Sequence, residues 1–373
     1  MNTFLRIIKN ETFCAYLLIP IALLAIALGS HFESHFLEQT LHIGNWNFNL
    51  REITLDYLLG LFFYNIGLQL RFELAEGALR DRKVLALSTL AALLGMLVPA
   101  GLFFIFHRIH GTSTTGWGIT MATDLPFVLA ALVVLKKNSL KGFVLALATI
   151  DDIGSVIVLS LLYKVHLHLG YLAVLTAILA LYFLLSYLFS SRALLLLVLV
   201  VGLAVGHQTG IASSLVALLF GILTFNNQKK GVALHEKLLA LVQPLSAFVV
   251  IPIFVFVSLF RRFDFSLHSV GSTLVLSLII ARLIGKPVGI LLGLAIGRLA
   301  LRVKVPFSFA DALLIAALGT LGLDVSLIFA QSDFMGSELN LAIVAILLTI
   351  PAGAILSLVV SFFPRAPTLR KSR

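Results

Sequence analysis

The sequence predicts an all-α polytopic membrane protein with about twelve transmembrane helices. Hydrophobic residues make up 60% of the 373 residues, charged residues make up 12%, and the mean hydropathy is +1.07. A soluble fold could not bury this much apolar surface, so the solvent around most of the chain is membrane lipid. Because the polar stretches between apolar runs are short, residues 1–373 are expected to form a single membrane domain.

The predicted helices are apolar runs of about 20 residues, the length that spans the hydrocarbon core of a bilayer. They are centred near residues 22, 62, 95, 125, 152, 179, 200, 217, 249, 282, 319 and 350. The opening MNTFLRIIKNETF leads into the first run without a small-residue cleavage pattern, so no cleavable signal is expected. The single cysteine, Cys14, excludes intrachain disulfides and metal–thiolate clusters.

Basic residues favour one side of this topology. With the amino terminus in the cytoplasm, 20 of the 27 Lys and Arg residues fall on the cytoplasmic side, whereas five fall on the other side: Arg51, Arg108, Lys164, Arg261 and Arg262. This positive-inside asymmetry predicts a multi-pass protein of the bacterial inner membrane with both termini cytoplasmic. The net charge of +10 therefore reflects topology and does not indicate nucleic-acid binding.

A small outer β-hairpin is predicted between the first two spans. In LHIGNWNFNL, residues 41–50, a central Gly44-Asn45 pair is flanked by residues that partly alternate between apolar and polar, which is typical of a two-residue hairpin turn. An isolated hairpin is only marginally stable in water. One interpretation is that the hairpin pairs with a second copy in a homodimer, and the other is an ordinary structured loop.

Charged residues inside the predicted spans are the strongest functional signal. They are Asp124 in ITMATDLPFVLAAL, Asp151 and Asp152 in ATIDDIGS, Asp324 in LGTLGLDVSLIFA and Lys286 in IIARLIGKPVGILLG. Each charge at the bilayer centre costs about 2.5 to 3.5 kcal/mol on insertion scales, so function is the first explanation to consider. The structural alternative is an Asp at a misplaced helix end or one that packs against Ser or Thr.

The paired aspartates predict a site for protons or a metal cation. Adjacent helical residues point about 100° apart, so one carboxylate can face a cavity while the other faces a neighbouring helix. Two carboxylates this close cannot both ionise freely without a compensating cation. Lys286 is the obvious compensating charge, whereas Arg282, near the start of the same span, either snorkels to the interface or pairs with Asp324.

Two spans carry signals for interruption at membrane depth. Pro126 disfavours helix in GWGITMATDLPF, and Gly319 and Gly322 do so in LGTLGLDVS. Half-helix ends carry charge that Asp124 and Lys286 could neutralise. The two spans hold matching places in two three-span groups, the third to fifth and the tenth to twelfth, which predicts inverted repeats with two discontinuous helices crossing at a midplane ion site.

These motifs resemble those of the NhaA-type sodium/proton antiporter family. GWGITMATDLPFVLAALVVL and LALATIDDIGSVIVLSLLY resemble its broken fourth helix and its fifth helix, LIGKPVGI resembles its tenth-helix lysine motif, and FFYNIGLQLRFELAEGAL resembles the end of its second helix. The resemblance covers essentially the whole chain. It implies a single transporter domain that exports Na+ or Li+ in exchange for H+ by alternating access and serves pH homeostasis.

The resemblance also implies roles for individual residues. Asp152 would be the principal ligand for the cation and the proton, and Asp151 would be its partner, joined to Lys286 by a salt bridge in the cation-free state. Asp151 and Asp152 would thus hold Na+ or Li+ transiently, and Asp124 and Thr123 would shape the crossing of the broken helices. The cations and protons are substrates, and no resident cofactor is implied.

Some positions depart from the family pattern. The family's Glu-x-Lys-Arg-Glu run is replaced by QLRFE, which places Gln69 and Phe72 at charged positions, and Ala212 replaces a family histidine. These positions are associated with pH regulation in the family. The resemblance therefore does not imply the family's usual activation at alkaline pH for this chain.

Asp324 occupies a position where the family has a threonine. The extra carboxylate could add a ligand, pair with Lys286 or Arg282, or change the stoichiometry or the choice of ion.

Other functions fit the sequence less well. The main alternative is a sodium-coupled symporter of a small organic anion on a similar fold, which would more naturally lack an Asp-Asp pair with a buried lysine. A cation channel is a weaker alternative. An intramembrane aspartyl protease is expected to carry Gly-x-Gly-Asp, which LGLD does not match, so the protein is predicted not to be an enzyme.

Overall fold

The structure, a computed structural model, describes residues 2–31, 40–43, 46–49, 58–162, 168–188, 191–225, 234–263, 265–300 and 307–363. The chain divides into two compact units, one of Met1–Gly77 with Val156–Arg262 and the other of Ala78–Ser155 with Phe263–Arg373. Each unit is assembled from two separate stretches of sequence. That both units act as one transporter domain over residues 1–373 stays a prediction.

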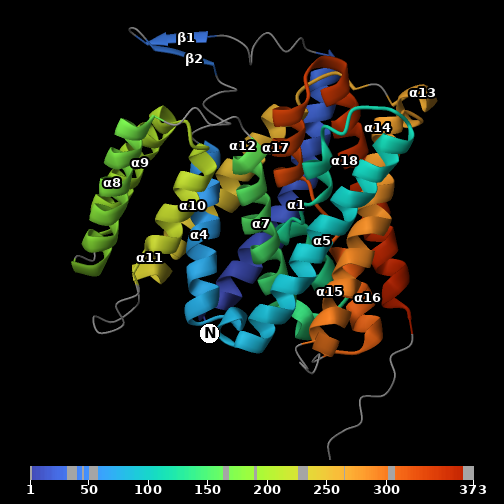
Figure 1. The fold of residues 1–373 in the computed structure, drawn as a ribbon, viewed down its shortest axis with the longest axis horizontal. Helices are drawn as coiled ribbons and strands as arrows, with labels where there is room; N and C mark the ends of the chain where they lie inside the picture. The colour runs from blue at the N-terminus through green and yellow to red at the C-terminus, as the bar shows by residue number, and fades with distance from the viewer. Residues whose placement is uncertain are drawn as a thin grey trace, which may run out of the picture. The chain divides into compact units, whose positions relative to one another are not determined.

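The first unit consists mainly of helices (Figure 1). Its elements are α1 (Asn2–His31), β1 (Thr40–Ile43), β2 (Trp46–Asn49), α4 (Leu59–Ala75), α8 (Leu169–Leu188), α9 (Arg192–Thr209), α10 (Ser213–Leu223), α11 (Leu234–Leu245), the π-helical turn η6 (Ser246–Val250) and α12 (Ile251–Leu259). It also holds the end of α7 (Lys141–Leu162). Helices α8 and α9 lie side by side, as do α4 and α10.

Strands β1 and β2 pair antiparallel, with Thr40 opposite Asn49 and Ile43 opposite Trp46. The predicted Gly44-Asn45 turn lies outside the described residues. The position of this pair of strands on the outer face of the membrane, and its pairing with a second copy, stay predictions.

The second unit holds every candidate ion-site residue. Its elements are the 3-10 turn η2 (Ala78–Arg80), α5 (Arg82–Ile109), the 3-10 turn η3 (Trp117–Thr120), α6 (Leu125–Val134), the 3-10 turn η4 (Asn138–Leu140), most of α7, α13 (Leu267–Val270), α14 (Thr273–Ile280), the π-helical turn η7 (Ala281–Gly285), α15 (Lys286–Ala300), α16 (Phe309–Leu318), α17 (Asp324–Asp333) and α18 (Gly336–Ser361). The second unit therefore contains the two spans that were predicted to be interrupted.

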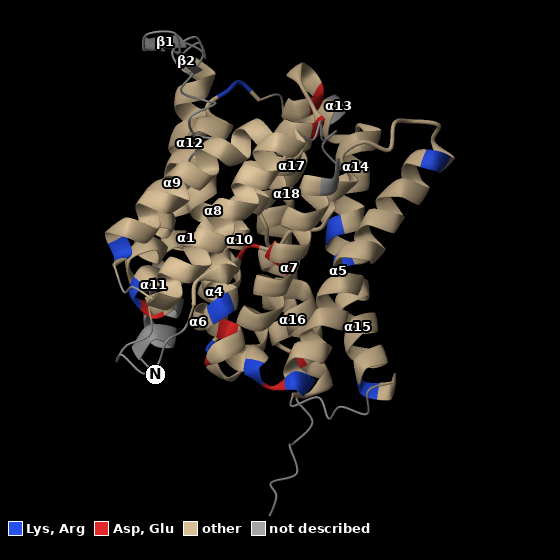
Figure 2. Cartoon of the chain, turned by 60° about the vertical axis from the view of Figure 1, so that its left-hand side comes forward, with Lys and Arg blue, Asp and Glu red and all other residues tan. Residues whose placement is uncertain are grey.

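The described residues contain nine helical stretches that are long and apolar enough to cross a membrane. They cover nine of the twelve predicted centres, which supports a multi-pass membrane protein. Of the other three, α4 has 17 residues and α10 has 11, while the run near residue 319 is divided between α16 and α17, with 10 residues each. The number twelve and the inverted repeats therefore stay predictions. Figure 2 shows most charged residues near helix ends and few within the helix bodies.

Glycines bring α5 and α15 into close contact in the second unit (Figure 1). Gly285, Gly289, Gly293 and Gly297 recur every four residues and therefore lie on one face of the η7–α15 helix. A Cβ atom added at Gly293 would lie 2.5 Å from the Cα of Ala91 on α5. Without a hydrophobic driving force between helices in lipid, small residues stabilise such interfaces by letting two backbones approach closely.

We expect Gly293→Ala to destabilise the protein. The added methyl group would collide with the α5 backbone, and overpacking of this kind costs about 1 to 3 kcal/mol, which lowers the midpoint of thermal unfolding by about 5 °C. The matched control is Gly101→Ala on α5, because a Cβ atom there meets nothing within 4 Å. Both variants are compared by thermal unfolding of the purified protein in detergent. Equal midpoints for the two variants would contradict the proposed packing.

Candidate functional site

Two interrupted helices meet in the second unit. Residues 121–124 separate η3 from α6, and residues 319–323 separate α16 from α17. The two breaks contact each other directly, because the Asp124 N–H donates to the Leu321 carbonyl at 2.8 Å and the Thr123 hydroxyl donates to the Gly319 carbonyl at 2.9 Å. The N–H and C=O groups at each break have no helical partner, and some of them thus form hydrogen bonds with groups at the other break instead.

The break before α6 begins where the sequence predicted it. Pro126 lies in the first turn of α6 with Asp124 as the N-cap residue. Proline is well tolerated in the first turn because an N–H there has no helical partner, so its absence costs no helical hydrogen bond. Pro126 therefore marks the start of the second half of a broken helix.

The side chain of Asp124 lies at the amino-terminal end of α17. Its Oδ2 atom accepts hydrogen bonds from the N–H groups of Leu323 and Asp324, the latter at 2.8 Å. Leu323, the N-cap residue, offers no capping side chain of its own. The carboxylate of Asp124 thus replaces the missing cap and opposes the positive end of the half-helix dipole.

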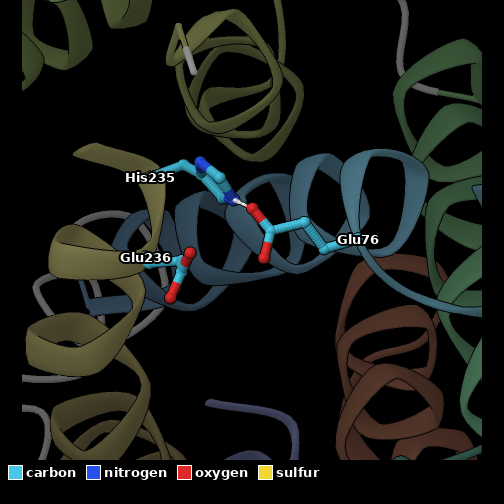
Figure 3. Close-up of side chains that lie close together, drawn as sticks. All are labelled: Glu76, His235 and Glu236. Carbon is cyan, nitrogen blue, oxygen red and sulfur yellow. Dashed lines mark ion pairs between the residues drawn. The ribbon is translucent and has the colours of Figure 1, made fainter. Parts of the chain in front are cut away.

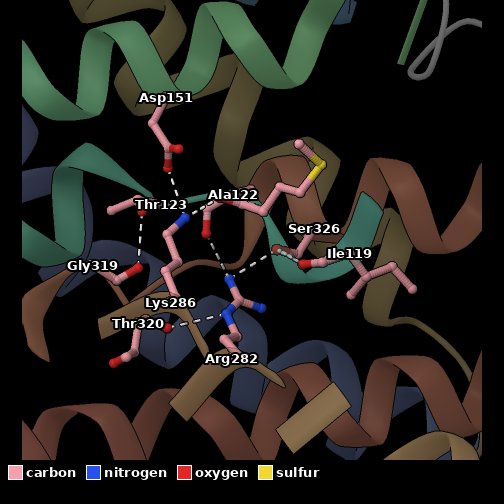
Figure 4. A network of polar contacts seen from close by, with 10 residues as sticks. Ile119, Ala122, Thr123, Asp151, Arg282, Lys286, Gly319, Thr320 and Ser326 are labelled. Carbon is pink, nitrogen blue, oxygen red and sulfur yellow. Dashed lines mark hydrogen bonds and ion pairs between the residues drawn. The ribbon is translucent and has the colours of Figure 1, made fainter. Parts of the chain in front are cut away.

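Two cationic side chains bind the carbonyl groups that follow the other half-helices (Figure 4). Lys286 donates to the carbonyl of Met121, just after η3. Arg282 donates through Nη2 to the carbonyl of Ala122 and through Nε to that of Thr320, both at 3.1 Å. These carbonyls lie at the negative ends of half-helices, where a cation is stabilising.

The structure corrects both alternatives considered for Arg282. Its side chain is only 2% exposed, and among the described residues it makes no ion pair with Asp324. It binds the two carbonyls named above and also donates to the Ser326 hydroxyl at 2.9 Å. Arg282 lies in the π-helical turn that precedes Lys286, a helical irregularity that often occurs at functional sites.

Asp151 and Lys286 form a buried ion pair. The distance between Lys286 Nζ and Asp151 Oδ2 is 2.7 Å, and the two side chains are 1% and 3% exposed. Breaking a buried pair by removing one partner leaves an uncompensated charge in a low dielectric, which is strongly destabilising. Asp151 on α7 and Lys286 at the start of α15 therefore depend on each other, because either charge alone would be buried without compensation.

Asp152 and Asp324 add two further carboxylates to the site. They are 8% and 3% exposed, and Asp152 interacts electrostatically with both Lys286 and Asp324. Asp324 also interacts with Asp124, and the Oδ1 atoms of these two residues are buried with no hydrogen-bond partner among the described residues. Closely spaced carboxylates with unused acceptor atoms can share a proton or coordinate a cation.

The charges of the described site do not balance. Four acids, Asp124, Asp151, Asp152 and Asp324, surround two bases, Arg282 and Lys286. Full ionisation would therefore leave an excess negative charge in a buried environment. Two protons, or one proton together with a hard monovalent cation bound by carboxylate and carbonyl oxygens, would remove that excess.

Sequence reasoning predicted these acids and Lys286 but missed the carbonyl ligands of Arg282 and the part played by Ser326. A buried arginine four residues before the lysine was the available signal, but its partners are 38 to 160 residues away along the chain.

The departures at Gln69, Phe72 and Ala212 lie in the first unit, where Gln69 and Phe72 are buried on α4.

Comparison with known proteins agrees with the sequence resemblance. The sequence model of the family described as Na+/H+ antiporter 1 matches residues 5–361. A protein of Aliarcobacter butzleri (strain RM4018) named Na(+)/H(+) antiporter NhaA 2 is 28% identical over 354 residues, 88% of this chain and 88% of its own length. A protein of the same name from Clostridium beijerinckii is 32% identical over 312 residues, 78% of this chain and 76% of its own length.

Two further similarities extend the comparison. The Escherichia coli (strain K12) protein named Na(+)/H(+) antiporter NhaA is 30% identical over 289 residues, 75% of this chain and 74% of its own length. A solved structure of the sodium proton antiporter MjNhaP1 from Methanocaldococcus jannaschii has a TM-score of 0.58 at 14% identity and covers 96% of this chain and 99% of that chain. This last similarity concerns the fold alone.

Proposed function

The chain belongs to the Na+/H+ antiporter 1 family, and on that premise we propose that it is a secondary-active antiporter that exports Na+ or Li+ in exchange for H+. The observation that carries the proposal is the buried Asp151–Lys286 ion pair, at 2.7 Å, beside Asp152 and the two helix breaks. The transported ions are substrates, and the mechanism requires no resident cofactor.

The proposed mechanism is competition between a cation and protons for the same carboxylates. Asp152 is the principal ligand, and Asp151 changes between its bond to Lys286 and the cation. Lys286, Asp124 and Thr123 hold the two breaks together while the site opens first to one side of the membrane and then to the other. An acid at this depth is tolerated because it is occupied by a proton, by a cation or by the lysine.

The direct test is proton movement in proteoliposomes when Na+, Li+ or K+ is added to one side. Antiport predicts that Na+ or Li+ drives protons in the opposite direction without any organic solute. The alternative, a sodium-coupled symporter, predicts that Na+ moves protons little and instead drives uptake of a labelled organic anion. Absence of a proton response to every cation would contradict antiport.

Asp324 is proposed as an additional member of the ion site. Its negative charge acts on Asp152 and Asp124, so it strengthens the binding of either a proton or a cation nearby. We expect Asp324→Asn to raise the apparent KM for Na+ at alkaline pH by about tenfold, the effect of about 1.4 kcal/mol. With less negative charge near Asp152, the acid limit of activity should also shift to lower pH.

The test of Asp324 is transport measured over a range of pH, with exposed Glu338 supplying the control variant Glu338→Gln. An unchanged KM and pH profile in Asp324→Asn would show that this carboxylate only packs the crossing. A changed preference among Na+, Li+ and K+ would further identify it as a determinant of selectivity.

The proposal also covers the membrane in which the protein resides and its oligomeric state. We place the protein in the bacterial inner membrane with both termini cytoplasmic, in accord with the distribution of Lys and Arg. We also propose a homodimer formed through residues 41–50, because a two-stranded sheet such as β1–β2 is marginal by itself. Deletion of residues 41–50 should then yield monomers in size-exclusion chromatography with light scattering.

A further inference from the structure

A group of potential metal ligands lies in the first unit, at the junction of α4 and α11. Glu76 directly follows α4, and His235 and Glu236 lie in the first turn of α11. Each of the three residues offers one ligand atom within 4.8 Å of the others. Figure 3 shows the His235 ring directed at the Glu76 carboxylate, with the Glu236 carboxylate close by.

The surroundings of His235 give a second, independent observation that points to a ligand. The His235 side chain is 0% exposed, and among the described residues neither ring nitrogen has a hydrogen-bond partner. A buried imidazole without partners is costly, and such groups are rare in native structures. The nearest acceptor on Glu76 lies 3.9 Å from Nε2, too far for a hydrogen bond.

A metal ion can bridge His235 and Glu76, which lie too far apart for a hydrogen bond. Zn2+ binds imidazole nitrogen and carboxylate oxygen at about 2.0 to 2.2 Å in tetrahedral geometry, which places two of its ligand atoms about 3.4 Å apart. The separation of 3.9 Å between His235 Nε2 and Glu76 Oε1 exceeds that distance by about 0.5 Å, a movement that the exposed Glu76 side chain can make. Glu76 is exposed and Glu236 is half-buried, so an ion can enter from solution and both side chains can adjust.

The charges and the ligand types indicate which ion would bind. The charge of Arg71 acts on His235, but the two carboxylates outnumber this single positive charge. An imidazole with two carboxylates is a ligand set for divalent transition metals, whereas alkali ions prefer oxygen ligands. A site of this kind would therefore discriminate against the transported Na+ or Li+.

We propose that Glu76, His235 and Glu236 bind a divalent transition-metal ion of the zinc class and so link the end of α4 to the start of α11. Helices α4 and α11 already pack against each other, so the ion would strengthen an existing contact between them. The site is separate from the ion site of the second unit and does not depend on the proposed transport reaction.

The test is Zn2+ binding to the purified full-length protein after removal of metals with a chelator. Because a ligand that binds the folded state stabilises it, saturating Zn2+ should raise the thermal-unfolding midpoint of the wild type by about 5 °C, and Mg2+ should not. Glu76→Gln, Glu236→Gln and His235→Gln should each abolish the shift. The exposed His207 on α9, in the same unit, supplies the control His207→Gln, which should keep it.

Co2+ gives a second measurement that does not depend on stability. Co2+ bound by one imidazole and two carboxylates should produce visible absorption bands in the wild type and in His207→Gln, and these bands should vanish in Glu236→Gln. His235 is fully buried, so its variant can fail to fold. The variants of the two more exposed glutamates therefore decide whether the metal site exists. Absence of a Zn2+ shift in the wild type, or an equal shift in all variants, would overturn the proposal.

Discussion

Asp152→Asn is expected to abolish sodium-dependent proton movement in proteoliposomes. The amide cannot release or bind a proton as the carboxylate does, and it is a weaker ligand for a cation. Loss of groups that merely orient ion ligands costs about 10- to 100-fold, so loss of the principal ligand should reduce exchange by about 100-fold or more. The rate of Na+-driven proton flux, followed with a pH-sensitive dye, measures the effect.

The control for this substitution is Glu338→Gln, the same chemical change at an exposed residue in the first turn of α18. It should transport like the wild type. If Asp152→Asn kept at least half of the wild-type rate while remaining folded, Asp152 would not be the ion ligand.

Lys286→Met is expected to destabilise the protein strongly. It removes one partner of a buried ion pair and leaves Asp151 without compensation, a change that typically costs about 3 to 5 kcal/mol. It also removes the donor to the Met121 carbonyl at the first helix break. The midpoint of thermal unfolding in detergent should therefore fall by about 10 °C.

A double variant separates the ion pair from simple packing. Asp151→Asn together with Lys286→Met removes both charges, and replacing a whole buried pair is far less costly than breaking it. The double variant should thus recover more than half of the midpoint lost in Lys286→Met. If the two substitutions instead lowered the midpoint additively, the 2.7 Å ion pair would contribute little to stability.

Composition and local sequence were sufficient to predict the membrane class, most of the spans and the acids. Charges are costly in lipid, so Asp124, Asp151, Asp152 and Lys286 could be identified from the hydropathy of their surroundings alone. The first break could be predicted because Pro126 acts locally on its own helix.

Other features depend on tertiary contacts that a single sequence does not encode locally. Asp124 caps a helix that begins 200 residues later, and Lys286 pairs with a residue 135 positions earlier. The sequence alone does not single out His235, because its neighbour Glu76 comes from a distant helix. The helices α10, α16 and α17 are each shorter than a full span, and hydropathy alone does not predict where they end.

The most direct test of the central claim is the pH dependence of the apparent KM for Na+ in proteoliposomes. If Na+ and H+ compete for the same carboxylates, binding of one must weaken binding of the other by the same factor. The account predicts that, at acidic pH, KM rises about tenfold per pH unit for each proton displaced, while the maximal rate stays nearly constant. A KM that is independent of pH, with acid lowering only the maximal rate, would contradict competition at the Asp151–Asp152 site.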